Sequence, residues 1–536
     1  LTDFENGKPA FFQKNFSRTS DPNQAAEFSV AQLGFYLQDE WNITPKLKLT
    51  IGARVDIPTF PESPMQNDSV AKYFPEISTT DTPSGNLLFS PRVGFNYDIS
   101  GDRTTQLRGG VGVFTGRIPY VWISNNYGNS GMLYAEVRNA SSGLDFRNWG
   151  MNPYVQPGVG SPGTGAARLI SEINVMDKDL KLPQILRFNV GLDNQLPLGF
   201  IGTVEFQYSK TINDMLYRKL NIKPAVGNVP IIGSGLDGRP IYGGTDGKNN
   251  NFTDVLQIYN TSGGYQYNLV FQAQRNVARG LSVNAGYVYG QSKDRNSVNS
   301  SQANSQMRYN PVKYDANNPD LVRSQYEVEH RTYMSLSYVH EFFENAATTF
   351  SLYYNGQSGS PFSFNVRGDL NGDGFDQNDL FYIPRNSSEI LLGTIVNNQY
   401  KPASPSMWND LNSFIENNDY LSSNRGKIAE RNGASNPWRN ILDFRLTQDI
   451  PDLWGMGKFQ VSLDILNVLN LLNSEWGYDE SVFSTYNTVT LQGKVTYEGK
   501  KNAPVYTFSK PARNVPWTIN DLTSRWAMQL GIRYSI

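Results

Sequence analysis

Stretches of about ten residues that alternate apolar and polar side chains recur in pairs along the chain, each pair joined by a short turn. The clearest is residues 458–467, where Phe459, Val461, Leu463 and Ile465 alternate with polar residues. A period of two is that of a β-strand with two different faces. Strands of soluble sheets usually have about five or six residues, whereas strands that cross a membrane have about nine to eleven. The pattern therefore predicts an all-β fold, a transmembrane antiparallel β-barrel.

The same pattern predicts thirteen strands whose connections alternate between short turns and long loops. The strands are expected at residues 31–42, 47–57, 87–98, 104–115, 185–196, 200–211, 265–276, 281–292, 327–342, 346–357, 438–449, 458–469 and 526–536. The long loops are 58–86, 116–184, 212–264, 293–326, 358–437 and 470–525. Bacterial barrels keep short turns on the periplasmic side and long loops outside, so this alternation orients every strand.

Composition limits the other classes of fold and function. The hairpin repeat runs through nearly all 536 residues without a change in composition, so residues 1–536 are predicted to form a single barrel domain. No run of about 18 apolar residues is present, and the mean hydropathy of −0.47 suits half-polar strands with long loops. A net charge of −2 without a basic cluster argues against nucleic acid as a partner.

Side chains suited to catalysis are scarce. Cysteine is absent, and the two histidines, His330 and His340, fall on one face of a predicted strand. We expect them to lie among the aromatic residues of the membrane border rather than in a hydrolase triad, and no glycine pattern marks a nucleophilic serine. The sequence therefore predicts a protein that is not an enzyme.

Several segments resemble TonB-dependent outer-membrane receptors, in the order in which that family has them. The segments similar to its middle strands are Gly34–Trp41, Leu49–Val55 and Phe89–Phe95, and those similar to its last two strands are Asp464–Asn473 and Trp526–Tyr534. The loop segment Asp369–Leu380, followed by Tyr382–Pro384, is similar to the Bacteroidetes type, the Oar-like or SusC-like receptors.

The resemblance implies a barrel of 22 strands filled by an amino-terminal plug that also carries the segment bound by TonB. The thirteen strands would be the carboxyl-terminal part of that barrel, and the plug, the TonB-binding segment and the first strands would precede Leu1. The implied function is import of a large or scarce ligand that binds to the extracellular loops. The implied partners are outer-membrane lipids, TonB through the absent amino-terminal region, and a surface lipoprotein of the kind that accompanies SusC-like receptors. Export of protein or peptide, or a passive or adhesive surface barrel, are the alternatives.

By alternation, charged residues on nine strand positions are predicted to face the lumen. They are Arg54, Arg92, Arg108, Arg187, Glu205, Asp443, Arg445, Asp464 and Arg533, and the same parity adds Asp56, Asp193 and Glu341. Buried charges need partners, so most of them are expected to bind a plug or neighbouring strands. The others would line the path of the ligand.

A possible structural Ca²⁺ site is the one cofactor that the sequence suggests, at residues 369–380 within the loop 358–437. Oxygen side chains at positions 1, 3 and 5 and glycine at position 6 are how short loops surround Ca²⁺. The candidate ligands are Asp369, Asn371, Asp373, the carbonyl of Phe375, and Asp379. The acid usual at position 12 is replaced by Leu380, so a turn rich in Asn, Asp and Gly that satisfies its own backbone is the alternative.

Loop 116–184 is rich in aromatic residues, namely Tyr120, Trp122, Tyr127, Tyr134 and Trp149. Exposed aromatic rings stack on sugars, peptides or ring ligands, but they also pack long loops against their neighbours. Both roles are open, and Tyr120, Trp122, Tyr127 and Trp149 are the candidates for contact with a ligand.

Overall fold

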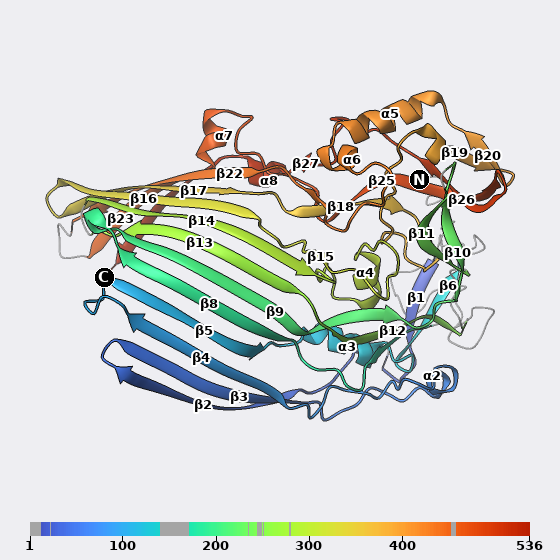
Figure 1. Cartoon of the computed structure of the whole chain (residues 1–536), viewed down its shortest axis with the longest axis horizontal. Helices are drawn as coiled ribbons and strands as arrows, with labels where there is room; N and C mark the ends of the chain where they lie inside the picture. The colour runs from blue at the N-terminus through green and yellow to red at the C-terminus, as the bar shows by residue number, and fades with distance from the viewer. Residues whose placement is uncertain are drawn as a thin grey trace.

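Most of the chain is antiparallel β-structure, as the computed structural model shows for residues 12–21, 23–139, 171–233, 235–243, 249, 251–277, 280–451 and 457–535. The largest sheet has sixteen strands, and thirteen of them follow one another as neighbours (Figure 1). These are β2 (Ala31–Thr44), β3 (Leu47–Thr59), β4 (Leu88–Asp98), β5 (Thr105–Thr115), β8 (Gln184–Gln195), β9 (Ile201–Lys219), β13 (Tyr265–Arg275), β14 (Gly280–Asp294), β16 (His330–Phe343), β17 (Ala346–Gln357), β22 (Arg439–Ile450), β23 (Lys458–Leu466) and β28 (Ala527–Ser535).

Each of these thirteen strands corresponds to one predicted strand, so the predicted fold class is confirmed. Three strand ends differ from the prediction by more than two residues. β23 ends at Leu466 rather than residue 469, and the short helix α7 (Val468–Leu472) follows it. β9 continues to Lys219 because its last residues leave the wall and pair with β12. β16 begins at His330 rather than residue 327, since the Glu327 carboxylate instead accepts the main-chain N–H of Ser292.

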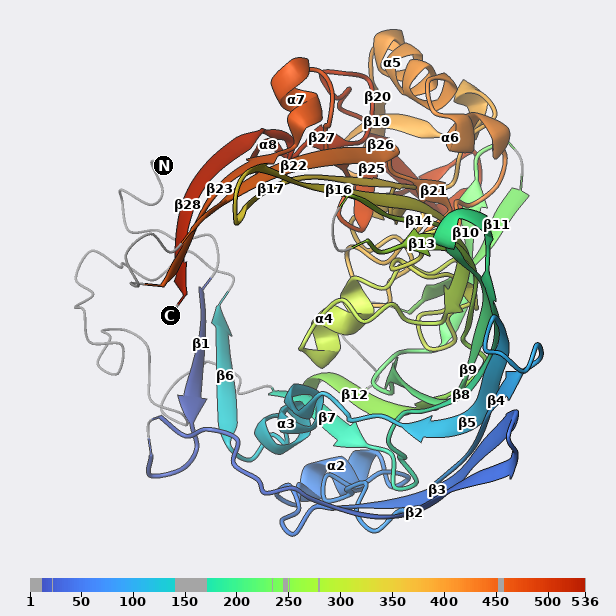
Figure 2. The same ribbon diagram turned by 90° about the vertical axis from the view of Figure 1, so that its left-hand side faces the viewer.

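The thirteen strands form a curved wall whose edges are β2 and β28. Figure 2, which looks along the strands, shows them following one another around an arc. In the described ranges no pairing joins β2 to β28, so each of these edge strands has one neighbour in the wall. The short connections gather at one end, and at one of them Asn345 has a φ of +59°, a conformation that asparagine tolerates in tight turns. No helix in the described part of the chain has the length and apolar character needed to cross a membrane.

The long loops 358–437 and 470–525 are not irregular, because they fold together into a structure that we call the cap. Its six-stranded sheet takes the order β20-β19-β26-β25-β18-β21, and Figure 1 shows α5, β19 and β20 beyond one end of the wall. The cap elements are β18 (Pro361–Arg367), η3 (Ser387–Glu389), β19 (Leu391–Val396), β20 (Gln399–Pro402), α5 (Pro405–Glu416), α6 (Asp419–Ser423), β21 (Ala434–Ser435), β25 (Thr485–Tyr497) and β26 (Lys500–Thr507).

Helix α5 shows why the cap holds together. Ser404 accepts a hydrogen bond from the main-chain N–H of Ser406, and Pro405 occupies the first turn, where its missing N–H costs nothing. Leu411, Phe414 and Ile415 then form one buried face, with spacings of three and four residues. That face packs into a core supplied by both loops, to which loop 212–264 adds Val229 and Ile241.

Four further loops meet in a second core, which we call the mouth cluster. Its elements are α2 (Asp68–Tyr73), α3 (Tyr120–Gly128), β7 (Ser171–Met176), β12 (Phe252–Thr261) and α4 (Ala303–Arg308). The short strand β15 (Val322–Arg323), from the same loop as α4, pairs with β14 of the wall. Viewed along the strands, α4 lies inside the outline of the wall (Figure 2). The loops at this end thus cover part of the opening.

The remaining elements are small. They are β1 (Phe12–Ser17) paired with β6 (Tyr134–Asn139), β10 (Ala225–Ile231) paired with β11 (Gly235–Tyr242), β24 (Glu480–Ser481) paired with β27 (Thr518–Ile519), η2 (Pro197–Gly199), α7 (Val468–Leu472) and α8 (Asp521–Ser524).

Candidate functional site

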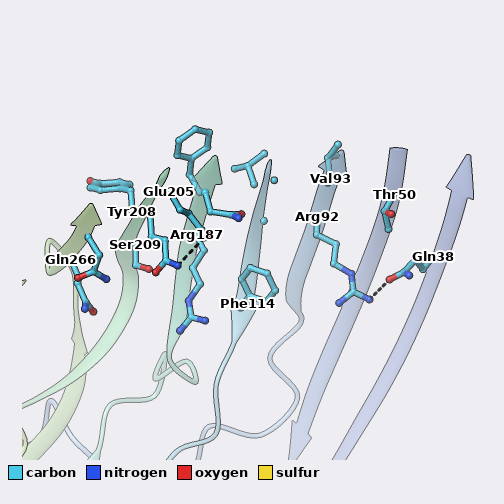
Figure 3. A pocket seen from close by; sticks show the side chains of 18 residues that line it. Gln38, Thr50, Arg92, Val93, Phe114, Arg187, Glu205, Tyr208, Ser209 and Gln266 are labelled. Carbon is cyan, nitrogen blue, oxygen red and sulfur yellow. Dashed lines mark hydrogen bonds between the residues drawn. The ribbon is translucent and has the colours of Figure 1, made fainter. Parts of the chain in front are cut away.

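A hollow of about 650 Å³ lies against strands β2 to β13. Among its lining residues are Gln38, Arg92, Arg187, Gln207 and Gln266. Figure 3 shows Arg92 reaching toward Gln38, to which its Nη2 donates a hydrogen bond of 2.8 Å. The guanidinium of Arg187 lies 5.9 Å from the centre of the Phe114 ring. Neither arginine pairs with a carboxylate among the described residues. The carboxylate of Glu205, which also lines the hollow, pairs with Arg108 instead.

Glycines on β4 and β5 make room for this hollow. Gly94 pairs with Gly110, and Gly112 pairs with Arg92, so adjacent positions of the polar face carry no side chain. A Cβ atom at Gly110 would lie 2.8 Å from the carbonyl oxygen of Val93, closer than real Cβ contacts allow. The close approach of the two strands therefore requires glycine there.

Arg108 is the centre of a charged group in the wall. Its Nε donates to Asp193 Oδ2 at 2.9 Å, and its Nη2 donates to Glu205 Oε2 at 2.7 Å. Thr203 and Gln207 complete the two carboxylates with hydrogen bonds of 2.7 Å and 2.9 Å. Three neighbouring strands are therefore joined by charges that satisfy one another.

Two further pairs bridge neighbouring positions of the wall. Arg54 donates to the buried carboxylate of Asp56, with 2.7 Å between Nη2 and Oδ1. Arg445 Nε lies 3.4 Å from Asp464 Oδ1. These contacts lie within the wall and do not depend on a bound group.

The strand register carries all nine predicted lumen-facing residues onto one face. Cross-strand partners share a face, and the pairings Arg92–Gly112, Gly112–Arg187 and Arg445–Asp464 illustrate this continuity. Asp443, whose Oδ1 accepts the main-chain N–H of Asn467, and Arg533, opposite Gln460, follow the same register. The opposite face exposes apolar side chains such as Val93, Phe188 and Leu530. That the polar face lines a lumen stays a prediction.

The aromatic candidates of loop 116–184 differ in their surroundings. Trp122 and Tyr127 are buried in the mouth cluster, where Trp122 packs edge-on against Tyr217 at 5.4 Å and Tyr127 stacks on Phe28 at 4.5 Å between ring centres. These two rings have the packing role that the sequence left open. Tyr120 is exposed and stays a candidate for ligand contact. Trp149 lies outside the described residues.

Both histidines lie among aromatic rings on the apolar face of β16. His340 stacks with Tyr338 at 6.0 Å between ring centres, and His330 Nδ1 lies 2.7 Å from the hydroxyl oxygen of Tyr287. His330 also stacks with Trp438. His330 Nε2 lies 3.8 Å from a carboxylate oxygen of Glu329, but Ser358 hydrogen-bonds to the main chain of His330 rather than to its ring. In the described ranges neither histidine ring joins a serine hydroxyl to a carboxylate as in a triad.

Segment 369–380 is a compact buried turn. Both carboxylate oxygens of Asp369 accept main-chain N–H groups, from Gly372 at 2.6 Å and Gly374 at 2.9 Å. Asn371 Oδ1 accepts the N–H of Asp373, and Asp373 Oδ1 accepts the N–H of Phe375, each at 2.9 Å. The turn thus satisfies much of its own backbone, as the second of the two sequence-based interpretations expects.

Asp379 has a different role from the other predicted oxygen donors. Its Oδ2 accepts the N–H of Leu370 at 2.8 Å, and its Oδ1 lies 3.2 Å from Nη1 of the fully buried Arg239. Burial raises the pKa of Asp379, and the Arg239 charge opposes that rise. Burial, and then the charges of Asp379 and Asp369, raise the pKa of Asp373.

Sequence reasoning did not single out Asn378, which lies within this segment, or Arg239 and Lys219, which contact it from other elements. Arg239 lies on β11 in the loop 212–264, and Lys219 ends β9. Asn378 donates through Nδ2 to Asp373 Oδ2 at 2.7 Å. Nothing in the local sequence marks Arg239 or Lys219, because their contacts join segments far apart in the chain.

A family model described as outer membrane beta barrel domain matches residues 1–499. A search of curated proteins finds no match. Solved structures with a similar chain trace include the outer membrane transporter YddB from Escherichia coli, at 13% identity and a TM-score of 0.46, covering 94% of this chain and 45% of that one. Another is BauA, the ferric preacinetobactin receptor from Acinetobacter baumannii, at 12% identity and a TM-score of 0.39, covering 94% of this chain and 43% of that one. This chain spans less than half the length of these structures.

Proposed function

The chain belongs to the outer membrane β-barrel domain family and lies in the bacterial outer membrane, and from this premise we propose that it is part of a TonB-dependent receptor that imports a large or scarce ligand. The observation that carries the proposal is the folded state of the long loops. Loops that share hydrophobic cores present a fixed surface, as a selective receptor needs, whereas a passive pore needs only an open mouth.

The two edges of the wall support a larger barrel. An unpaired strand edge within a bilayer leaves main-chain N–H and C=O groups without partners, at several kcal/mol each. Strands β2 and β28 are the edges of the described wall, so further strands would close it. The sequence resemblance supplies the finer proposal, a receptor of Bacteroidetes type, Oar-like or SusC-like, with a plug that TonB engages and a surface lipoprotein as partner.

The two positive groups of the hollow are the places where an anionic part of a plug or a ligand would bind. Arg92 and Arg187 hold no carboxylate partner in the described ranges, and guanidinium groups bind carboxylates and phosphates strongly. Export of protein or peptide stays the alternative with the same barrel and the opposite direction of transport.

The deciding experiment compares cells that carry the full-length gene with cells that lack it, each with and without TonB. Ligands depleted from a defined medium would be identified by mass spectrometry. An importer gives depletion that requires both the gene and TonB. Depletion that survives the loss of TonB would indicate a passive barrel, and the appearance of a secreted protein only in cells with the gene would indicate export.

A further inference from the structure

A second hollow, of about 470 Å³, lies between strands β17 and β22 of the wall and the segment 468–480. Helix α7, which belongs to that segment, lies outside the arc of the wall strands (Figure 2). Tyr354 lines the hollow and pairs with Met334 on one side and Leu442 on the other, so all three share the apolar face of the wall. In an outer-membrane barrel that face contacts lipid, so the hollow borders the membrane.

The hollow lies at the end of the wall from which the long loops leave. Tyr354 is close to the end of β17 and Asn440 to the start of β22, whereas the short turn between β16 and β17 is at the other end of these strands. Bacterial barrels keep their long loops outside the cell. The hollow is therefore near the outer border of the membrane, where lipid headgroups lie.

Aromatic rings form much of the lining of this hollow. They belong to Tyr354, Trp438, Trp476 and Tyr478. Two of the rings are held in place, because Asn440 Oδ1 accepts hydrogen bonds from the Tyr354 hydroxyl at 2.7 Å and from Trp438 Nε1 at 2.9 Å. Trp438 and Trp476 are nevertheless 45% and 53% exposed, so their faces are open to a ligand.

The charge in the hollow is negative. Its lining residues include the two acids Glu475 and Glu480 but no lysine or arginine. Glu480 pairs with Arg513, whereas the exposed Glu475 has no ion-pair partner among the described residues. The aromatic belt at a membrane border consists of tryptophan and tyrosine rings and does not require a carboxylate. The hollow thus combines aromatic faces with negative charge, which is the chemistry that binds a cation.

From this combination we propose that the hollow binds the headgroup of a membrane lipid that carries an ammonium group. Aromatic faces attract such cations within about 6 Å of the ring centre, tryptophan most strongly, and the Glu475 carboxylate would pair with the ammonium N–H groups. The acyl chains would follow the apolar face of β17, where Leu352 and Phe350 are exposed below Tyr354. This continuity with the lipid-facing side chains of the wall favours a lipid over a soluble ammonium compound.

The test uses the full-length protein purified from outer membranes and freed of lipid in a mild detergent. Native mass spectrometry during titration with phosphatidylethanolamine should show saturable binding, and phosphatidylglycerol with the same acyl chains, which has no ammonium group, should bind more weakly by about tenfold or more. Glu475→Gln and Trp476→Ala should each weaken the binding of phosphatidylethanolamine by about tenfold. Both side chains are exposed, so neither substitution should prevent folding.

The matched controls are Glu344→Gln and Trp41→Ala, which replace exposed side chains near the short turns at the other end of the wall. Both should leave the affinity for phosphatidylethanolamine unchanged. Absence of saturable binding, equal binding of the two lipids, or unchanged affinity in Glu475→Gln and Trp476→Ala would overturn the proposal.

A competition experiment separates a lipid from a soluble ligand with the same headgroup. Phosphoethanolamine, which has no acyl chains, should not displace the bound phosphatidylethanolamine at equal concentration. Equal displacement would show that the chains contribute nothing, and would overturn the assignment to a membrane lipid. None of these measurements involves transport, so their outcome is separate from that of the proposed function.

Discussion

Phe414 of α5 is the residue whose loss should test whether the cap is a cooperatively folded unit. Its side chain is 0% exposed. The ring lies 5.6 Å from that of Tyr486, 5.7 Å from that of Phe508 and 6.3 Å from that of Phe364, measured between ring centres. These neighbours come from both long loops, so Phe414→Ala removes the contact that joins them.

The expected cost is large compared with the stability of a small folded unit. Replacing a buried phenylalanine by alanine costs about 3–5 kcal/mol through lost burial and the cavity that remains. Domains are stable by about 5–15 kcal/mol in total. About 1.4 kcal/mol corresponds to a factor of ten in an equilibrium constant. The equilibrium constant for opening of the cap should therefore rise by about a hundredfold to several thousandfold.

Hydrogen exchange measured by mass spectrometry would show this change segment by segment. Peptides from β18, α5 and β25 should exchange faster by that factor, while peptides from the wall strands β3 to β5 should not change. Phe483→Ala is the control, because Phe483 is 84% exposed and its removal leaves no cavity. Unchanged exchange in the cap of Phe414→Ala, or equal acceleration in cap and wall, would refute the description of the cap as a separate folded unit with this core.

Three other substitutions test the wall and the part of β9 that extends beyond it. Gly110→Ala places a Cβ 2.8 Å from the Val93 carbonyl oxygen and should lower the free energy of unfolding by about 1–3 kcal/mol, which heated gels would show as a lower unfolding temperature. Gly94→Ala is the control and should be tolerated, because its Cβ would lie 3.6 Å from the nearest atom. Arg108→Met leaves two carboxylates of the wall without their shared cation and should lower the same temperature, by less than a fully buried pair would because Arg108 is partly exposed. Asp214 lies on the part of β9 beyond the wall, and burial is the main cause of its raised pKa. Its ionised form therefore destabilises the fold as the pH rises above about 4, the ordinary pKa of an aspartate. Asp214→Asn should slow local hydrogen exchange at neutral pH and should have no effect near pH 3.

The wall could be predicted from sequence because its rule is local. Each strand alternates along its own length, and turns such as that at Asn345 mark their own positions. The strand ends could not be predicted where a distant segment decides them. Lys219 belongs to β9 only because β12, more than thirty residues later by the register Leu256–Lys219, pairs with it.

The candidate site could be predicted only in part for the same reason. The oxygen-rich turn at Asp369 and Asp373 is visible as a motif, whereas the contact of Asp379 with Arg239 is not, because Arg239 reaches the turn from another loop. The burial of Trp122 likewise depends on Tyr217, 95 positions later in the printed sequence. Loop aromatics carry no local signal that separates packing from ligand contact.

The arginines on the polar face of the wall are of two kinds, those paired with carboxylates of the wall and those without such a partner. Arg108 has two carboxylates beside it, so its charge is neutralised within the wall. Arg92 and Arg187, on the same polar face, have a neutral amide and an aromatic ring instead. Arg187 is exposed and Arg92 is half-buried, so water solvates both guanidinium groups, and the stability of the wall does not require an acid beside either. Both groups are therefore available to an anionic partner, which the proposed receptor would supply through its plug or its ligand.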